Sequence, residues 1–192
     1  PTLVQVSPTG FKFPSVLNTN IRGGTCAKLD ELQTVCFANC VDIVCVTESW
    51  LTSSIAIDVI QIPNYTTYRR DRQDGRQGGG LLLFVQDDCN RACSRLTDYE
   101  VPDLETMWFL YRQPRMPRTV SHLLIGVIYH PPNGSHPHMV SHILDSVDSC
   151  SKQHPNLGVL LLGDFNSLPD TSLRSYPLKQ VVTLPTRGKA IL

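Results

Sequence analysis

Unbroken runs of apolar residues, each ended by glycine or by polar residues, divide most of the chain into short strands. The clearest is the five-residue run 158–162, which Gly163 ends. An apolar run of that length predicts a strand that is buried on both faces. The same kind of pattern predicts further strands at 15–17, 42–46, 65–70, 81–85, 105–111 and 121–129, with a short one near 180–182.

Helical periodicity is found in two places. Between residues 27 and 39, Leu29, Leu32 and Cys36 share one face of a helix. A second helix starts at Pro137, and its apolar stripe runs to about Cys150. Many hairpin-connected strands with only two helices predict an α+β fold, with two packed, mostly antiparallel sheets and helices outside.

We expect one domain over residues 15–192, because no linker or repeat interrupts it. Residues 1–14 contain three prolines and no periodicity, so we expect a flexible lead-in there. The chain starts at Pro1 rather than Met. That start predicts a fragment or a processed chain.

Composition narrows the class of protein. Hydrophobic residues make up 41% and charged residues 18%, with equal numbers of acids and bases, which indicates a globular chain. We expect no membrane partner, because no apolar run is long enough to span a bilayer. The seven cysteines form no Cys-x-x-Cys pair, so we interpret them as core residues of a protein in a reducing, intracellular compartment.

A basic hairpin tip joins the strands 65–70 and 81–85. Its turn contains Asp74-Gly75, a strong hairpin signal, and it carries four arginines, at 69, 70, 72 and 76. Two interpretations stay open, a solvated tip or contacts from Arg70 and Arg72 to a DNA backbone. A net charge of zero argues against strong nonspecific DNA binding, although clustered arginines can still form a local patch.

Polar side chains of one chemical kind stand at the ends of several predicted strands. They are Asn20, Glu48, Tyr129, Asp164 and Asn166. Taken singly, each is more often structural, and Asp-Phe-Asn is also a common turn. If the strand ends converge, however, they form a site of oxygen and amide groups, which suits Mg²⁺ or Mn²⁺ rather than zinc.

Chemistry assigns each of these groups a role. Glu48 would hold the ion, and Asp164 would orient or deprotonate the attacking water. Asn166, Asn20 and the Tyr129 hydroxyl would donate hydrogen bonds to phosphate oxygens.

Several motifs, in this order, resemble those of the endonuclease/exonuclease/phosphatase superfamily. Gly163-Asp164-Phe165-Asn166 is similar to its Gly-Asp-Phe-Asn motif, and Val46-Thr47-Glu48-Ser49-Trp50-Leu51 to its metal-binding Glu motif. The Trp-Leu version is typical of endonuclease domains of non-LTR (LINE-type) retrotransposons, relatives of the apurinic/apyrimidinic endonucleases. The segments 68–72 and 78–80 are also typical of those domains, and so is Ile128-Tyr129-His130-Pro131-Pro132. Lys28–Leu32 resembles the first helix of those domains.

The resemblance implies a four-layered α/β sandwich and a Mg²⁺-dependent phosphodiesterase. That enzyme would nick DNA in the nucleus for target-primed reverse transcription, with a reverse transcriptase domain in the same parent polypeptide. Glu48 and Asn20 would be the metal ligands, Tyr129 and Asn166 would contact the phosphate, and Asp164 would activate water. Asn18 is the alternative to Asn20, but Asn-x-x-Gly fits the family pattern better from Asn20 to Gly23.

The sequence departs from the family at its C-terminal end. The family has a downstream Asp and then a Ser-Asp-His, whereas no histidine follows His154 here. We therefore expect a domain that is truncated at its C-terminus. Two alternatives remain: a phosphatase of the same superfamily acting on a phosphoinositide, sphingomyelin or a nucleotide, and a catalytically inactive remnant.

Overall fold

The computed structural model describes residues 2–4, 13–113, 116–173 and 176–182. Nine strands form two mixed sheets in these residues. The first sheet has the order β1-β2-β3-β5-β4, in which only β2 and β3 are parallel. Its strands are β1 (Thr2–Val4), β2 (Val16–Asn20), β3 (Ile43–Thr47), β4 (Tyr65–Arg70) and β5 (Leu81–Gln86).

The second sheet has the order β6-β7-β8-β9, in which only β8 and β9 are parallel. Its strands are β6 (Cys93–Arg95), β7 (Glu105–Tyr111), β8 (His122–Tyr129) and β9 (Leu157–Asp164). Three short helical turns lie between strands, η1 (Ile57–Ile60), α2 (Asp87–Asn90) and η2 (Thr97–Tyr99), and a fourth, η3 (Asp170–Leu173), follows β9.

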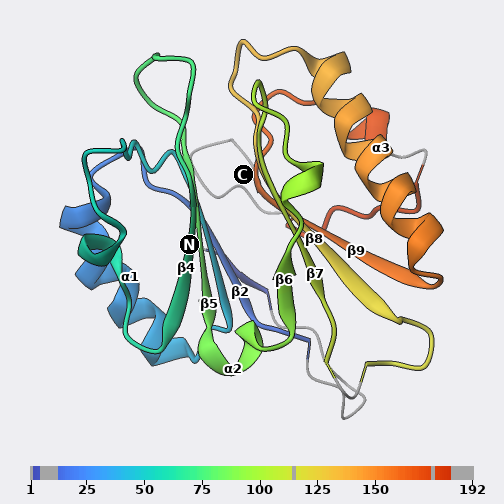
Figure 1. The fold of residues 1–192 in the computed structure, drawn as a ribbon, viewed down its shortest axis with the longest axis horizontal. Coiled ribbons are helices and arrows are strands. Elements are labelled where there is room, and N and C mark those ends of the chain that lie inside the picture. Colours follow the sequence, from blue (N-terminus) through green and yellow to red (C-terminus); the bar gives the residue numbers. More distant parts are fainter. Residues whose placement is uncertain (1, 5–12, 114–115, 174–175, 183–192) are drawn as a thin grey trace.

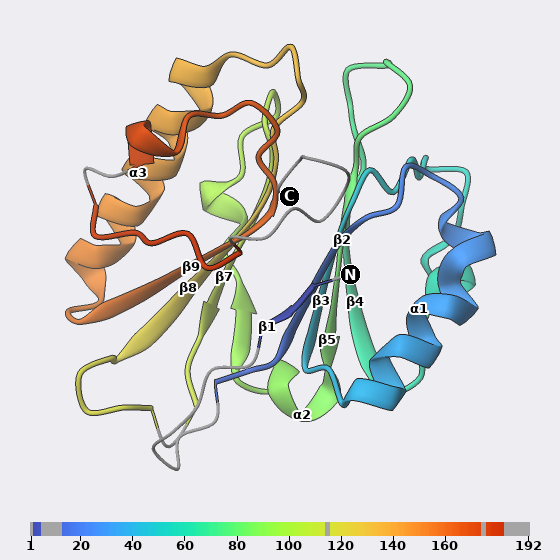
Figure 2. The ribbon, with the colours of Figure 1, turned by 180° about the vertical axis from the view of Figure 1, so that it is seen from behind.

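The two sheets pack face to face, and one long helix covers the outside of each. Helix α1 (Thr25–Asn39) lies on the first sheet and α3 (His136–Gln153) on the second, as Figures 1 and 2 show from opposite sides. The core between the sheets includes Cys45, Leu83, Phe109 and Ile125, all fully buried. The predicted α+β sandwich is thus confirmed. Among the described residues, no helix is long and apolar enough to cross a membrane.

Three local predictions need correction. Thr2–Val4 pair with β2 as strand β1, within the predicted flexible lead-in, while residues 1 and 5–12 lie outside the described part. No strand forms at 180–182. Strand β2 continues to Asn20, beyond the predicted strand 15–17, because its parallel ladder with β3 runs on to the pair Asn20 and Thr47. Ladder pairing outweighs the weak strand propensity of asparagine.

The two parallel pairs decide where the strands end. Parallel partners finish at the same edge of a sheet, so β2 and β3 end together, as do β8 and β9. Both pairs point toward the same end of the sandwich, below the hairpin tip 71–80 and the connection from β8 to α3 (Figure 1). Polar residues from both sheets therefore meet there.

Candidate active site

Asn20 connects the two sheets at their common end. It is the last residue of β2, and its Nδ2 donates to Glu48 Oε1 and to Asp164 Oδ2, each at 2.8 Å. Glu48 follows β3 of the first sheet and Asp164 ends β9 of the second. The two carboxylates approach each other across the sandwich.

A sharp backbone turn fixes Glu48. Glu48 and Trp50 have φ angles of 54° and 55°, in the left-handed region that bulky residues rarely adopt. The turn is held by the Gly23 N–H, which donates to the Glu48 carbonyl at 2.7 Å. The Ser49 and Trp50 N–H groups donate to the carbonyls of Gly80 and Gly79, at 3.2 and 2.9 Å. Two glycine-rich loops thus hold the residue that we expect to bind metal.

Tyr129 brings a hydroxyl to the same carboxylate. It ends β8, only 5% of it is exposed, and its hydroxyl donates to Glu48 Oε1 at 3.3 Å. Burial first, and then the charge of Glu48, raise the pKa of Tyr129 to about 12. The hydroxyl therefore stays protonated at neutral pH and can act as a hydrogen-bond donor.

Asp164 is almost fully buried, with 3% exposed. Its Oδ1 accepts from the Asn166 N–H at 2.9 Å, so Asp-Phe-Asn does form a local turn as well as part of the site. Asn166 is exposed, has a φ of 46°, and donates its Nδ2 to the His130 carbonyl at 2.7 Å. Asn18 lies apart from this cluster, because its Nδ2 donates to the Gly163 carbonyl at 2.9 Å.

The structure brings Asn20, Glu48, Tyr129 and Asp164 into one hydrogen-bonded cluster and places Asn166 next to it. We call these five residues the carboxylate cluster. The predicted convergence of strand ends is thus what the fold produces.

The hairpin arginines are paired with acids of the same molecule. Arg72 donates to Glu105 Oε1 through Nε and Nη2, at 2.8 and 2.6 Å, and its guanidinium carbon lies 5.8 Å from the centre of the Tyr129 ring. Arg70 donates to Glu100 at 2.9 Å and to the Thr106 carbonyl at 3.0 Å. Of the two predicted DNA contacts, Arg72 therefore adjoins the carboxylate cluster, and Arg70 connects strands inside the protein.

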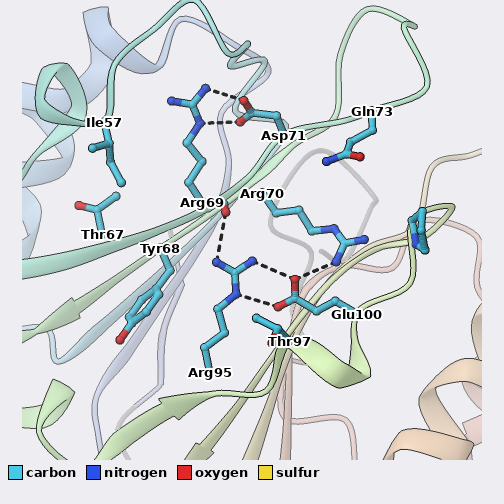
Figure 3. Close-up of a pocket in the computed structure, with 11 residues that line it drawn as sticks. Ile57, Thr67, Tyr68, Arg69, Arg70, Asp71, Gln73, Arg95, Thr97 and Glu100 are labelled. Atoms are coloured by element: carbon cyan, nitrogen blue, oxygen red, sulfur yellow. Dashed lines mark hydrogen bonds and ion pairs between the residues drawn. The ribbon is translucent and has the colours of Figure 1, made fainter.

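A cavity of about 610 Å³ lies between the edge strands β4 and β6. Figure 3 shows that Glu100 accepts hydrogen bonds from both Arg70 and Arg95, and that Arg69 is paired with Asp71 above them. Of the site residues predicted from sequence, only Arg70 lines this cavity. Its arginines are neutralised by internal ion pairs, so it carries little free charge for a ligand.

A smaller cavity of about 240 Å³ is lined in part by Arg72, Glu105 and His130, but by no residue of the carboxylate cluster. Sequence reasoning missed Glu105, although it opens β7 directly opposite Tyr129. His130 was also missed. It is 1% exposed, its Nε2 lies 2.8 Å from His136 Nδ1, and burial and then His136 lower its pKa.

The donor set suits a hard divalent cation. Among the described residues, no group of three or more His, Cys, Asp or Glu side chains is placed to hold a metal. The carboxylate cluster instead offers two carboxylates and carboxamides, without a thiolate or imidazole. Mg²⁺ usually takes one or two protein carboxylates and completes its shell with water and substrate phosphate, so the residues present fit that ion.

Comparison with protein families gives one match. The model of the Endonuclease/Exonuclease/phosphatase family matches residues 17–182. The family comprises nucleases and phosphatases, which hydrolyse phosphate esters and generally use divalent metal ions, typically Mg²⁺. No curated protein sequence matches the chain.

Three solved structures illustrate the fold. AP endonuclease LMAP from Leishmania major is 16% identical, with a TM-score of 0.58 over 78% of this chain and 54% of that one. The endonuclease domain of TRAS1, a telomere-specific non-LTR retrotransposon, is 11% identical, with a TM-score of 0.55 over 81% and 60%. The APE2 catalytic domain from Xenopus laevis is 13% identical, with a TM-score of 0.54 over 79% and 58%. This chain thus spans less than two thirds of each of them, and such identities establish the fold alone.

Proposed function

Because this chain belongs to the endonuclease/exonuclease/phosphatase family, we propose that it is a Mg²⁺-dependent phosphodiesterase that nicks DNA. The observation that carries the proposal is the double hydrogen bond from Asn20 to Glu48 and Asp164. It places two carboxylates from different sheets around one amide. Two carboxylates that approach each other, one buried and one half-buried, are costly to maintain, so a cluster of this kind indicates a functional site.

Each residue of the carboxylate cluster has its own role in the proposed reaction. Glu48 and Asn20 would hold Mg²⁺, which when bound neutralises charge on the phosphate. Asp164, oriented by hydrogen bonds to both of its oxygens, accepts the proton of the attacking water. The protonated Tyr129 hydroxyl and the exposed Asn166 carboxamide donate to phosphate oxygens as their negative charge grows.

DNA is the substrate that the surroundings of the site favour. Arg72 lies 5.8 Å from the centre of the Tyr129 ring, so it is a basic side chain next to the carboxylate cluster, although it is already paired with Glu105. The Glu48-Ser49-Trp50-Leu51 motif resembles the version typical of non-LTR retrotransposon endonucleases, and the AP endonuclease and TRAS1 neighbours are endonucleases by their titles. We extend the proposal to target-site nicking for reverse transcription in the nucleus, with a reverse transcriptase domain in the parent polypeptide.

Plasmid nicking tests the proposal. Supercoiled plasmid is incubated with the chain in Mg²⁺ or EDTA, alongside Glu48→Gln, Asp164→Asn and the control Asp88→Asn. Asp88 is a carboxylate whose side chain is 79% exposed. We expect nicking to require Mg²⁺ and to fall at least roughly 100-fold in both site variants, but not in the control.

Three results would count against the proposal. Nicking that survives both site substitutions would remove the carboxylate cluster from catalysis. Hydrolysis of a phosphoinositide or a nucleotide phosphate, with plasmid left intact, would favour the phosphatase alternative. No hydrolysis of any of these substrates would mark the chain as an inactive remnant.

A further inference from the structure

Trp50 is an exposed aromatic side chain beside the carboxylate cluster. It lies two residues after Glu48, and 41% of it is exposed, whereas the chain's other tryptophan, Trp108, is fully buried. Two residues span at most about 7 Å, so Trp50 stands within one nucleotide of any phosphate bound at Glu48.

Two glycines lie against the Trp50 indole. A Cβ atom at Gly23 would lie 2.5 Å from Trp50 Cε3, and one at Gly78 would lie 3.4 Å from Trp50 Nε1. Part of the ring system therefore rests on the Gly23 backbone, where a Cβ atom would clash with it, and the Gly78 backbone lies at contact distance. The remainder faces solvent and is free to contact a ligand.

Stability does not explain a tryptophan at this position. With a φ of 55°, its backbone occupies a region that disfavours bulky side chains. Hydrogen bonding of the Trp50 N–H to the Gly79 carbonyl at 2.9 Å holds it there. A strained backbone that presents a large apolar ring to water, next to two carboxylates, indicates a functional constraint.

We infer that Trp50 is a stacking platform for an unpaired nucleobase next to the scissile phosphate. This inference rests on the proposed function and narrows its substrate to single-stranded or locally opened DNA, because a base that is stacked within a duplex cannot lie on the indole. Aromatic side chains bind all bases by stacking, whatever the sequence. Arg22, adjacent to Gly23, is exposed and has no carboxylate partner among the described residues, so it can meet the strand's backbone.

DNA binding in EDTA tests the inference without catalysis: affinities are measured by the anisotropy of dye-labelled strands in every protein, and quenching of Trp50 emission is measured in the two proteins that keep Trp50. The probes are a 12-nucleotide single-stranded DNA and a strand of equal length in which every base is absent, both in EDTA. The proteins are the wild type, Trp50→Phe, Trp50→Leu and the control Phe37→Leu, since Phe37 is 45% exposed on helix α1. Emission from the buried Trp108 reports that each variant is folded.

We expect the wild type to bind the DNA roughly 5- to 150-fold more tightly than the base-free strand, as stacking of one base implies. DNA should quench the Trp50 emission, and the base-free strand should not. The affinity ratio should fall to about one in Trp50→Leu, persist largely in Trp50→Phe, and stay unchanged in Phe37→Leu.

Two results overturn the inference, and they can be told apart. If both strands bind and quench equally while the chain still nicks plasmid, stacking on Trp50 is wrong and the proposed function stands. If neither strand binds and no hydrolysis occurs, both the inference and the proposed function fail.

Discussion

Replacing Asn20 with alanine should destabilise the protein more than any other single carboxamide change near the site. Asp164 is buried, and Asn20 donates to its Oδ2 at 2.8 Å. A hydrogen bond to a charged group contributes about 1.5–3 kcal/mol. The bond to Glu48 adds about 1 kcal/mol or less, because water can replace Asn20 at this half-buried carboxylate. We therefore expect Asn20→Ala to lower the free energy of unfolding by about 2–4 kcal/mol.

Urea unfolding in EDTA at pH 7 measures this loss. With a slope of about 2 kcal/mol per molar urea, the midpoint should fall by about 1–2 M. Asn18→Ala is the matched control. Asn18 makes one neutral bond, to the Gly163 carbonyl at 2.9 Å, and its Oδ1 is buried with no hydrogen-bond partner in the described part of the chain. Its loss should therefore cost about 1 kcal/mol or less.

The comparison of the two variants decides whether the reasoning holds. If Asn18→Ala lowers the midpoint as much as Asn20→Ala, the contact near Gly163 holds the sheets together. In that case, the bridge between the carboxylates contributes little to stability.

Two further predictions concern single side chains. Tyr129→Phe removes the hydroxyl that donates to Glu48 and should slow nicking by roughly 100- to 1000-fold. The urea midpoint of this variant should stay close to that of the wild type. An unchanged nicking rate would exclude the hydroxyl from the reaction. For His142, burial first and then the charges of His138 and Arg70 lower the pKa below 6.5, so its contribution to stability is complete above that pH and declines as the pH falls. His142→Gln removes this titration and should flatten the dependence of the unfolding free energy on pH between about 7 and 5, as measured by urea unfolding at each pH. An unaltered slope would show that His142 is not the source of that pH dependence.

Local pattern was sufficient to locate the longer strands, but it missed the three-residue strands β1 and β6. The boundaries of β4 and β7, Tyr65–Arg70 and Glu105–Tyr111, are those that the pattern predicts, because both are apolar or alternating runs that polar residues end. The membership of sheets was not predictable in this way. Glu48 and Asp164 end strands of similar composition, and nothing in either run indicates which strand pairs with which. Pairing depends on contacts between residues far apart in the chain.

The same limit explains the arginines. Their clustering near the hairpin tip is plain from the sequence, but two of the acids that pair with them come from distant segments. Glu100 and Glu105 lie about 30 residues beyond Arg70 and Arg72, on the other side of the sandwich. A basic run therefore predicts a charged surface correctly only when the fold brings no carboxylate to it. Here the fold brings one to each of these two arginines.

The carboxylate cluster is also the place where the two sheets touch at their polar end, and this links stability to chemistry. Apolar residues at Asn20 and Glu48 would avoid the cost of two nearby carboxylates, and such replacements are often neutral or stabilising. The chain instead keeps Glu48 and Asp164 together, and within the described residues the groups that donate to them, from Asn20, Tyr129 and the Asn166 backbone, are all neutral. Sites that retain such a cost are usually those that function requires. The arrangement is therefore better explained by a cation and a phosphate that share the site than by the packing of the sandwich.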